Sequence, residues 1–250
     1  MYKGDILTNE LLLFQGKPWQ ITEDISVKNP TLREISDFGE DNYWSLITHL
    51  CATSFDYRLP LQEDGIDYLD IDDWHMFLYT YLTFDPEDTK VLIPDLNISS
   101  LLPAEKTETK EIVLLDSSGK EIINQEIYAK IVTFIRDCHG LERNFKVPGN
   151  AAARAVYMQD AMDARMNAGR KAPSSVLSPL VSSLCNREGF KYNFETVWDL
   201  SIYAFMDATR RISKIDAANH FANGIYSGNL DLSKMNKTQL NKNMNWMGEL

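Results

Sequence analysis

One short segment, residues 112–123 with the sequence IVLLDSSGKEII, restricts the fold more than any other part of the chain. Two apolar runs flank the residues Asp-Ser-Ser-Gly, and Gly119 can adopt the positive φ angle that a tight turn between two strands requires. The segment therefore predicts a β-hairpin that turns at residues 116–119. A chain with such a hairpin is not an all-α protein, whatever surrounds it.

The N-terminal segment also predicts β-structure. Residues 10–14 and 19–27 are short apolar or alternating runs, and Gly16, Lys17 and Pro18 separate them. Runs of this length on either side of turn residues are typical of two paired strands. We therefore expect a small β-ribbon in this part of the chain.

Helical signals follow the ribbon. Asn29 and Pro30 predict a helix start, because Asn caps free backbone N–H groups and Pro is tolerated in the first turn. Gly39 predicts the end of that helix, and a second apolar face follows in the sequence NYWSLITHL. We therefore expect a pair of packed helices.

Two further helices are expected on either side of the hairpin. Asp72 or Asp73 predicts the cap of an apolar and aromatic helix from residue 74 to about residue 84. Apolar residues recur at helical spacing in residues 125–138. Residues 104–111, with the sequence AEKTETKE, predict a polar connector ahead of the hairpin.

The C-terminal half predicts only helices. Residues 150–168 combine alanines and methionines with other strong helix formers, and Gly169 and Pro173 are the stop signals. Another helix is expected in residues 173–185, where Pro179 has to lie near the start or kink the helix.

Together these signals predict an α+β protein, predominantly α-helical, with a small N-terminal β-ribbon, a central β-hairpin and a C-terminal helical bundle. We expect a mixed α+β region in residues 1–145, a helical region in residues 146–228 and a polar tail in residues 229–250. The boundary between the first two regions is either a domain boundary or a loop within one shared core.

Charge and composition limit the classes of function. The chain has 36 acidic and 25 basic residues, a formal net charge of -11. This argues against nucleic-acid binding, because contacts to phosphates depend on clustered Lys and Arg.

No run approaches the roughly 18 apolar residues that span a bilayer, and the N-terminus lacks the apolar segment of a secretory signal. Cys51, Cys138 and Cys185 are far apart and are expected to be reduced core residues. We therefore expect a soluble cytoplasmic protein without a membrane partner.

No pattern in the sequence predicts catalysis. An acidic run offers one alternative, a metal-dependent enzyme, because hard divalent cations prefer several carboxylate oxygens. Its residues are Glu63, Asp64, Asp67, Asp70, Asp72 and Asp73. The run lacks the spacing of a calcium loop, and helix capping accounts for part of it. The four histidines lack zinc spacing. We therefore expect no catalytic residue, no metal and no cofactor.

Residues 189–212, with the sequence GFKYNFETVWDLSIYAFMDATRRI, combine aromatic clusters with a pair of arginines. Projected as one helix, the segment has a polar spine. The spine consists of Asp199, Tyr203, Asp207, Arg210 and Lys214. The apolar side offers four candidate partner-binding residues: Trp198, Ile202, Phe205 and Ile212. The alternative is that this apolar side belongs to the protein's own core.

Three segments resemble a known group of proteins. They are ISVKNPTLREISDFGEDNYWSLITHL (residues 25–50), DYLDIDDWHMFLYTYL (residues 67–82) and SLCNREGFKYNFETVWDLSIYAFMDATRRISKI (residues 183–215). The chain resembles tailed-bacteriophage proteins found among the tail genes of phages of Firmicutes and gut bacteria. Its layout is similar to that of tail assembly chaperones and of T4-type baseplate hub assembly proteins. The resemblance covers roughly residues 20–225, and its motifs are structural.

The resemblance implies a non-enzymatic role in building a phage tail. The protein is then expected to hold another tail protein, such as the tape measure protein or a baseplate component, until assembly in the host cytoplasm. The alternative is a structural subunit of the virion, in the baseplate, tail end or connector. A homo-oligomer is compatible with either role. The resemblance carries over no catalytic residue, because such families are not enzymes.

Overall fold

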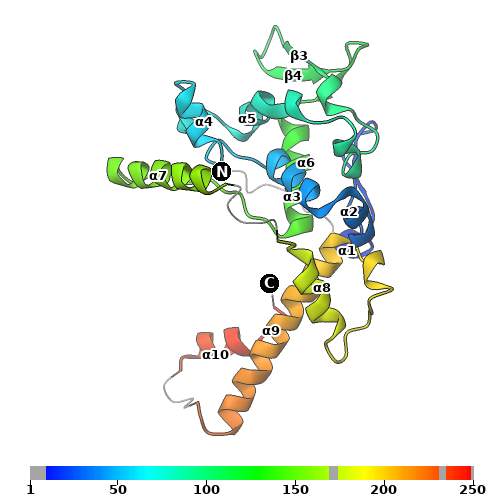
Figure 1. Cartoon of the computed structure of the whole chain (residues 1–250), viewed down its shortest axis with the longest axis vertical. Coiled ribbons are helices and arrows are strands. Elements are labelled where there is room, and N and C mark those ends of the chain that lie inside the picture. The colour runs from blue at the N-terminus through cyan, green and yellow to red at the C-terminus, as the bar shows by residue number, and fades with distance from the viewer. Residues whose placement is uncertain (1–9, 169–173, 231–234, 249–250) are drawn as a thin grey trace.

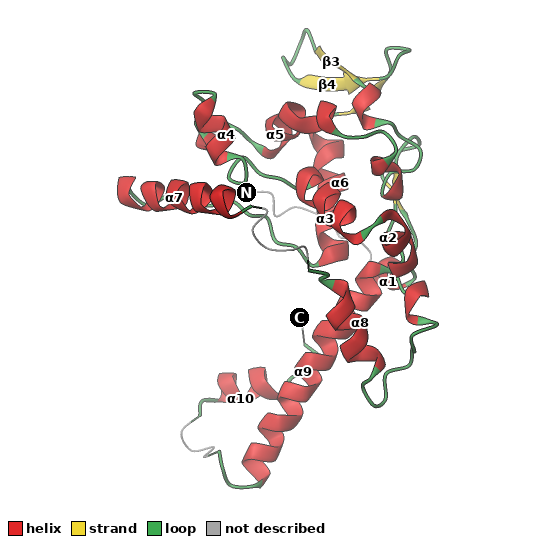
Figure 2. Ribbon diagram, viewed as in Figure 1, coloured by secondary structure: helices red, strands yellow, loops and turns green. Residues whose placement is uncertain are grey.

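The computed structural model describes residues 10–168, 174–230 and 235–248, and Figure 1 shows their arrangement. The helices are α1 (Glu10–Phe14), α2 (Leu32–Phe38), α3 (Glu40–Leu50), α4 (Arg58–Glu63), α5 (Asp73–Thr80), α6 (Gln125–His139), α7 (Ala151–Asn167), α8 (Leu177–Cys185), α9 (Ile202–Tyr226) and α10 (Lys237–Met244). The strands are β1 (Trp19–Gln20), β2 (Ser26–Val27), β3 (Leu102–Glu105), β4 (Ile112–Leu115) and β5 (Glu121–Ile123). Helices dominate in Figure 2, which confirms the predicted α+β, predominantly α-helical class.

The N-terminal ribbon is shorter than predicted. Strands β1 and β2 pair in antiparallel fashion, with Trp19 opposite Val27. The expectation of a strand in residues 10–14 was wrong, because these residues form α1. A short apolar run fits either a strand or a helix, and tertiary contacts decide between them. Here Leu13 is 1% exposed in the core, and the Phe14 ring packs edge-on against Tyr203 at 4.9 Å.

The paired helices α2 and α3 confirm the break predicted at Gly39, but the cap of α2 differs from the prediction. Thr31 caps the helix, and its side chain exchanges hydrogen bonds with Glu34 in a capping box. Asn29 is buried and instead donates to the Leu13 carbonyl at 2.8 Å, while its Oδ1 accepts from the Tyr203 amide at 3.3 Å. The asparagine therefore joins three segments of the chain rather than starting a helix.

The central part of the chain follows the predicted order with one addition. Asp72 caps α5 by accepting from the His75 amide at 2.8 Å, as expected. The hairpin of β4 and β5 turns at Gly119, whose φ of +85° confirms the predicted role. The expected polar connector contributes to a third strand, β3, which pairs with β4 along its whole length. Pro103 is tolerated in β3 because β3 is an edge strand.

Helices α7 and α8 appear in the predicted segments, and a further helix, α10, lies in the segment predicted as a polar tail. Asn150 caps α7 by accepting from the Ala153 amide at 2.8 Å. Pro179 is the third residue of α8, where a missing N–H costs no intrahelical hydrogen bond. The predicted stop signals Gly169 and Pro173 lie outside the described residues.

The single helix expected in residues 189–212 was wrong. A short 3₁₀ turn, Val197–Asp199, is followed by extended backbone at Leu200, and α9 begins at Ile202. The helix breaks because this backbone pairs elsewhere: Leu200 accepts from the Leu32 amide at 2.9 Å, and the Ile202 amide donates to Pro30 at 2.8 Å. Asp199 therefore does not belong to the polar spine predicted for one continuous helix.

One main core joins most of the molecule. Its buried side chains come from α1, α2, α3, α5, α6, α8 and α9 and from the small sheets. A second cluster, Phe55, Leu61, Tyr68 and Met76, packs beside Tyr157 of α7. In Figure 1, α7 and the far half of α9 project from the body. Helices on both sides of the predicted boundary at residue 145 contribute to the main core, and the division into regions stays a prediction. Among the described residues, no helix has the length and apolar character needed to cross a membrane.

Candidate functional site

The four candidate partner-binding residues lie at two depths. Ile202 and Phe205 are 0% exposed and belong to the main core. Trp198 and Ile212 are partly buried and pack against that core from outside. In this conformation only the latter two are accessible to a partner, and they line separate hollows on two faces of α8.

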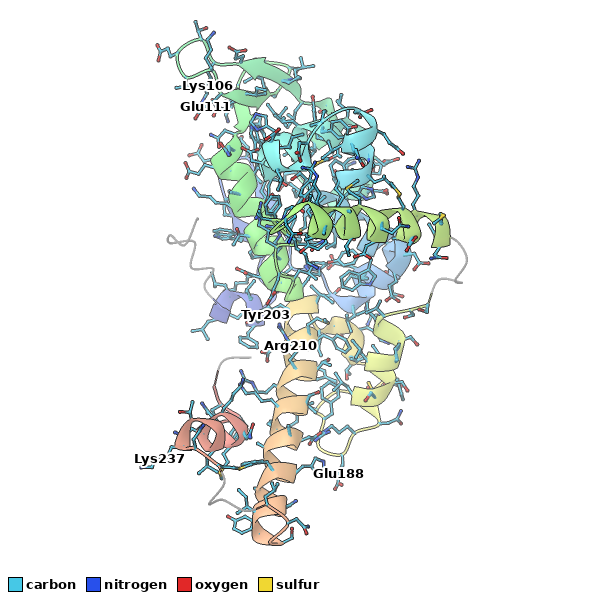
Figure 3. All side chains as sticks on the ribbon, turned by 90° about the vertical axis from the view of Figure 1, so that its left-hand side faces the viewer. Lys106, Glu111, Glu188, Tyr203, Arg210 and Lys237 are labelled. Carbon is cyan, nitrogen blue, oxygen red and sulfur yellow. The ribbon has the colours of Figure 1, made fainter. Side chains whose placement is uncertain are left out.

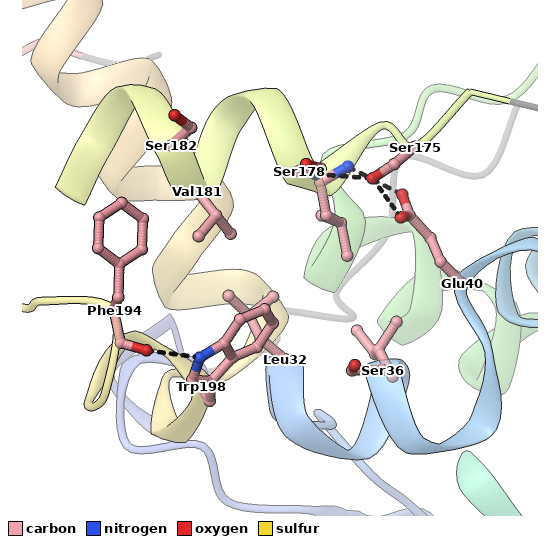
Figure 4. A pocket seen from close by; sticks show the side chains of 11 residues that line it. Leu32, Ser36, Glu40, Ser175, Ser178, Val181, Ser182, Phe194 and Trp198 are labelled. Carbon is pink, nitrogen blue, oxygen red and sulfur yellow. Dashed lines mark hydrogen bonds between the residues drawn. The ribbon is translucent and has the colours of Figure 1, made fainter. Parts of the chain in front are cut away.

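The larger hollow is an apolar groove of about 330 Å³ between α2 and α8 (Figure 4). Its apolar lining consists of Leu32 and Ile35 from α2, Leu177 and Val181 from α8, and Phe194 and Trp198 from the loop after α8. The side chains of Ser36, Ser178 and Ser182 are also part of the lining. Apolar grooves with a few polar groups are the usual shape of binding sites.

Glu40, the first residue of α3, holds α8 in place. Its carboxylate accepts hydrogen bonds from the Ser175 hydroxyl at 2.5 Å and from the amides of Val176 and Leu177 at 2.7 and 2.8 Å. It also accepts from the Trp44 indole at 3.2 Å. The amides are among the unpaired donors at the start of α8, so Glu40 caps a helix that lies far from it in sequence. This cap fixes one wall of the groove.

These hydrogen bonds change the titration of Glu40. Partial burial raises the pKa of its carboxyl, but the hydrogen bonds from Ser175, Leu177, Trp44 and Val176 together outweigh burial and lower the pKa below its ordinary value. The folded protein therefore binds this proton less readily than the unfolded chain. The stabilisation is present above the ordinary pKa of a glutamate and is lost as the pH falls through the lowered value.

We expect Glu40→Gln to destabilise the protein at neutral pH by about 1 kcal/mol. The charged acceptor is lost, and the partly exposed site reduces the effect below that of a buried charge. Urea unfolding at pH 7 measures the loss, and the difference from wild type is expected to shrink below about pH 4. Asp41→Asn is the matched control, because it removes the neighbouring exposed acid. Equal effects of the two variants at pH 7 would contradict the capping role.

Trp198 and Phe194 form the end of the groove that lies closest to the surface loop. The Trp198 indole donates to the Phe194 carbonyl at 2.8 Å, as Figure 4 shows. The Phe194 ring is 54% exposed. The Arg33 guanidinium on α2 binds the Asp199 carboxylate at 2.9 Å and so fixes the turn that carries Trp198. The Trp198 ring is thus held in position, while the Phe194 ring stays open to solvent.

The smaller hollow, of about 170 Å³, lies on another face of α8 and includes Ile212. An ion pair between Arg187 and Asp216 lines it and joins the end of α8 to α9. This hollow has more polar character than the groove, because a charged pair and the hydroxyls of Ser183, Thr209 and Ser213 line it.

The acidic run does not converge on one point. Asp67 pairs with Arg154 at 2.8 Å, Asp73 binds Arg143 through two hydrogen bonds of 2.7 and 2.8 Å, and Asp72 caps α5. Glu63 pairs with a basic residue of α7. Within the described ranges, no group of three or more His, Cys, Asp or Glu side chains is arranged to hold a metal ion. Capping and ion pairs therefore account for most of the run.

The arginine pair of α9 has an intramolecular role. Arg211 donates to the carbonyls of Trp246 and Gly248 at 2.8 and 2.9 Å, and Lys214 donates to Gly248 at 3.0 Å. Arg210 lies against Gly140, where a Cβ would come within 2.3 Å of the guanidinium. These contacts hold part of the predicted polar tail against α9.

A buried polar pair joins α3 to α6. The Tyr43 hydroxyl and His139 Nε2 are 2.6 Å apart, and His139 Nδ1 is 2.6 Å from the Ile135 carbonyl. Because the carbonyl only accepts, Nδ1 carries the proton and Nε2 accepts from the tyrosine. His139 is 2% exposed, and its burial lowers its pKa to about 4. The imidazole is therefore neutral at physiological pH.

Sequence reasoning found Trp198 but missed the rest of the groove. Phe194 was part of the aromatic stretch, and the helical projection started after it. Glu40 was an acid in the first turn of its own helix, and no local signal indicates that it caps α8. The pairing of α2 with α8 is a long-range contact, which periodicity within either helix does not reveal.

Comparison with known proteins finds a similarity in the C-terminal part of the chain. Residues 170–250, about a third of the chain, match the family model described as the YomV second domain. No curated protein and no solved structure matches the chain. The matched residues include α8, α9, α10 and the aromatic loop, and so one wall of the groove. The match indicates a phage-derived protein of the Bacillus prophage type.

Proposed function

We propose that this phage-derived protein is a non-enzymatic tail assembly protein that binds a helical segment of a tail component in the groove between α2 and α8. The observation that carries the proposal is the groove itself: an apolar hollow, open to solvent, with a phage-associated domain as one wall. The favoured partner is the tape measure protein, which the resemblance to tail assembly chaperones implies.

The chemistry of the groove fits the apolar face of an amphipathic helix. Leu32, Ile35 and Val181 form the apolar floor of the groove but are themselves buried, so the half-buried Trp198 and the exposed Phe194 ring offer the contacts to an inserted side chain. Helices that bind in grooves insert apolar side chains at intervals of three and four residues. A few aromatic anchors supply most of the binding energy in such contacts. Phe194 and Trp198 are therefore the residues on which affinity depends in this proposal.

The charge of the chain fits a chaperone-like role. A net charge of -11 keeps the protein soluble while it holds an aggregation-prone partner in the host cytoplasm. A metal-dependent enzyme would need the carboxylates of the acidic run as ligands. Most of them form caps and ion pairs instead, which supports a non-enzymatic role.

We expect Ser182→Phe to abolish co-purification of the tape measure protein from cells that express both proteins. Ser182 is an exposed residue of α8 that lines the groove, so the ring occupies the binding space without entering the core. Phe194→Ala is expected to weaken binding by about tenfold or more, as for an aromatic anchor. The measurement is a pull-down followed by titration calorimetry.

Ser183→Phe is the matched control, because it adds the same ring to the next residue of α8, on the face of the smaller hollow. It is expected to retain the partner. No co-purification with wild type, or equal losses in both serine variants, would overturn the proposal.

The alternative role as a virion subunit has a separate measurement. A chaperone is expected to be absent from purified phage particles, and a baseplate, tail-end or connector subunit is expected at fixed stoichiometry. Mass spectrometry of the particles distinguishes the two. Stoichiometric presence would replace the chaperone form of the proposal with the structural one.

A further inference from the structure

The start of α8 is held by a side chain from another helix. Oε1 of Glu40 accepts hydrogen bonds from the amides of Val176 and Leu177 at 2.7 and 2.8 Å. Ser175, Leu177 and Ser178 lie at this start of α8 and also line the groove. A shift of the capped amides therefore moves part of the lining of the groove.

Trp44 fixes the direction of the Glu40 side chain. The two residues are four positions apart on α3, so their side chains lie on the same face of that helix. The Trp44 indole donates to Oε1 of Glu40 at 3.2 Å, and this is the same oxygen that accepts from the two amides of α8. Trp44 thus contacts the cap of α8 without being part of the groove lining.

The Trp44 ring is held in turn by the buried polar pair of α3 and α6. It packs edge-on against His139 and Tyr43, with 5.8 and 5.6 Å between the ring centroids. Edge-to-face contacts at such distances are attractive. Both ring nitrogens of His139 are hydrogen-bonded, one to the Tyr43 hydroxyl and one to the Ile135 carbonyl. The Trp44 ring therefore rests on a pair whose own position is fixed.

Helix α9 also fixes the end of α6. Arg210 lies against Gly140, the residue that follows His139, and a Cβ at this glycine would have no room beside the guanidinium. Figure 3 shows Arg210 near the place where α6 and α9 meet. The end of α6 is therefore a firm support for the Trp44 ring.

We propose that Trp44 is a positioning residue for the groove: by orienting Glu40 it fixes the start of α8, so partner affinity also depends on a side chain outside the groove. The binding part of this inference rests on the proposed function, and the structural part does not. Loss of the indole N–H leaves the Glu40 side chain free to take other rotamers. The two amides of α8 are then capped for a smaller fraction of the time.

Hydrogen exchange of single amides in the full-length protein, followed by NMR, tests the structural part. Trp44→Phe keeps an aromatic ring and removes the indole N–H. It is expected to raise the exchange rates of the Val176 and Leu177 amides by about two- to tenfold, the range that corresponds to one hydrogen bond. Circular dichroism checks that the variant stays folded. Unchanged rates at both amides would overturn the inference.

Two further variants separate positioning by Trp44 from a general loss of packing. Glu40→Ala removes the acceptor, so adding Trp44→Phe to it is expected to change the two exchange rates no further. Trp19→Phe makes the same ring change at another partly buried tryptophan, which packs against the main core at Phe134. It is expected to leave the two rates as in wild type. A further rise in the Glu40→Ala background, or an equal rise in Trp19→Phe, would show that Trp44 does not act through Glu40.

Titration calorimetry with the tape measure protein tests the binding part. Trp44→Phe is expected to weaken binding by about two- to tenfold, and Trp19→Phe is expected to bind as wild type does. Unchanged affinity in Trp44→Phe would overturn the inference and leave the proposed function in place. No binding by wild type would overturn the proposed function and the binding part together, and the exchange rates would still decide whether Trp44 fixes α8.

Discussion

Phe205→Ala is expected to lower the free energy of unfolding by about 3–5 kcal/mol, the usual cost of removing a fully buried aromatic ring. Phe205 is 0% exposed and lies in the first turns of α9, within the main core. The loss is a large part of the total stability of about 5–15 kcal/mol that folded domains have. Urea unfolding followed by circular dichroism measures it as a shift of the midpoint at unchanged slope.

Trp198→Ala is the matched variant in the same stretch. Trp198 is partly buried at the groove, so its loss removes less packing and is expected to cost about 1–2 kcal/mol. It is expected to weaken partner binding, and Phe205→Ala is expected to affect binding only through unfolding. If Phe205→Ala left stability unchanged and abolished binding, Phe205 would be a partner-binding surface residue. This result would contradict its buried position in the structure.

Stability is expected to fall as the pH is lowered from about 6.5 to about 4, and His139 is expected to cause much of the fall. Burial lowers the pKa of His139 to about 4 in the folded protein, whereas the unfolded chain takes up the proton near pH 6.5. Between these values the unfolded state binds more protons, so stability rises with pH across this window. The full shift corresponds to roughly 3 kcal/mol.

The measurement is the free energy of unfolding at several pH values in wild type and in His139→Gln. Carboxylates also titrate in this range, so the difference between the two proteins isolates the histidine. His139→Gln is expected to be less stable at pH 7 and to have a shallower slope between pH 4 and 6.5. His49→Gln changes an exposed histidine and is the matched control. A wild-type slope in His139→Gln would show that the buried imidazole does not control this dependence.

Local sequence signals correctly predicted the places where a single residue ends a helix, caps a helix or forms a tight turn. Gly39, Asp72 and Gly119 each act in the structure as their spacing and chemistry indicated. Caps and tight turns depend on a few neighbouring residues, so they can be recognised without the rest of the fold. The errors arose where backbone or side-chain partners lie far away, as for α1 and for the break at Leu200.

The candidate site shows the same division. Trp198 was identified from its place in an aromatic stretch, and the structure places it in the groove. Ile202 and Phe205 came from the same stretch and are part of the core. An apolar helix face has the same periodicity whether a partner or the protein itself covers it. The positions of α2, α6 and α8 around α9 show which residues of this face the protein itself covers and which remain accessible to a partner.

The sequence by itself determined the α+β class, the cap of α5, the hairpin turn and the acidic net charge, because these depend on composition and on residues a few positions apart. The tertiary structure alone decided which apolar residues are accessible, that Glu40 caps α8, and that Arg211 holds part of the predicted polar tail against α9. These depend on contacts between residues that are 35 or more positions apart. Such contacts form only when the core assembles, so no local pattern records them.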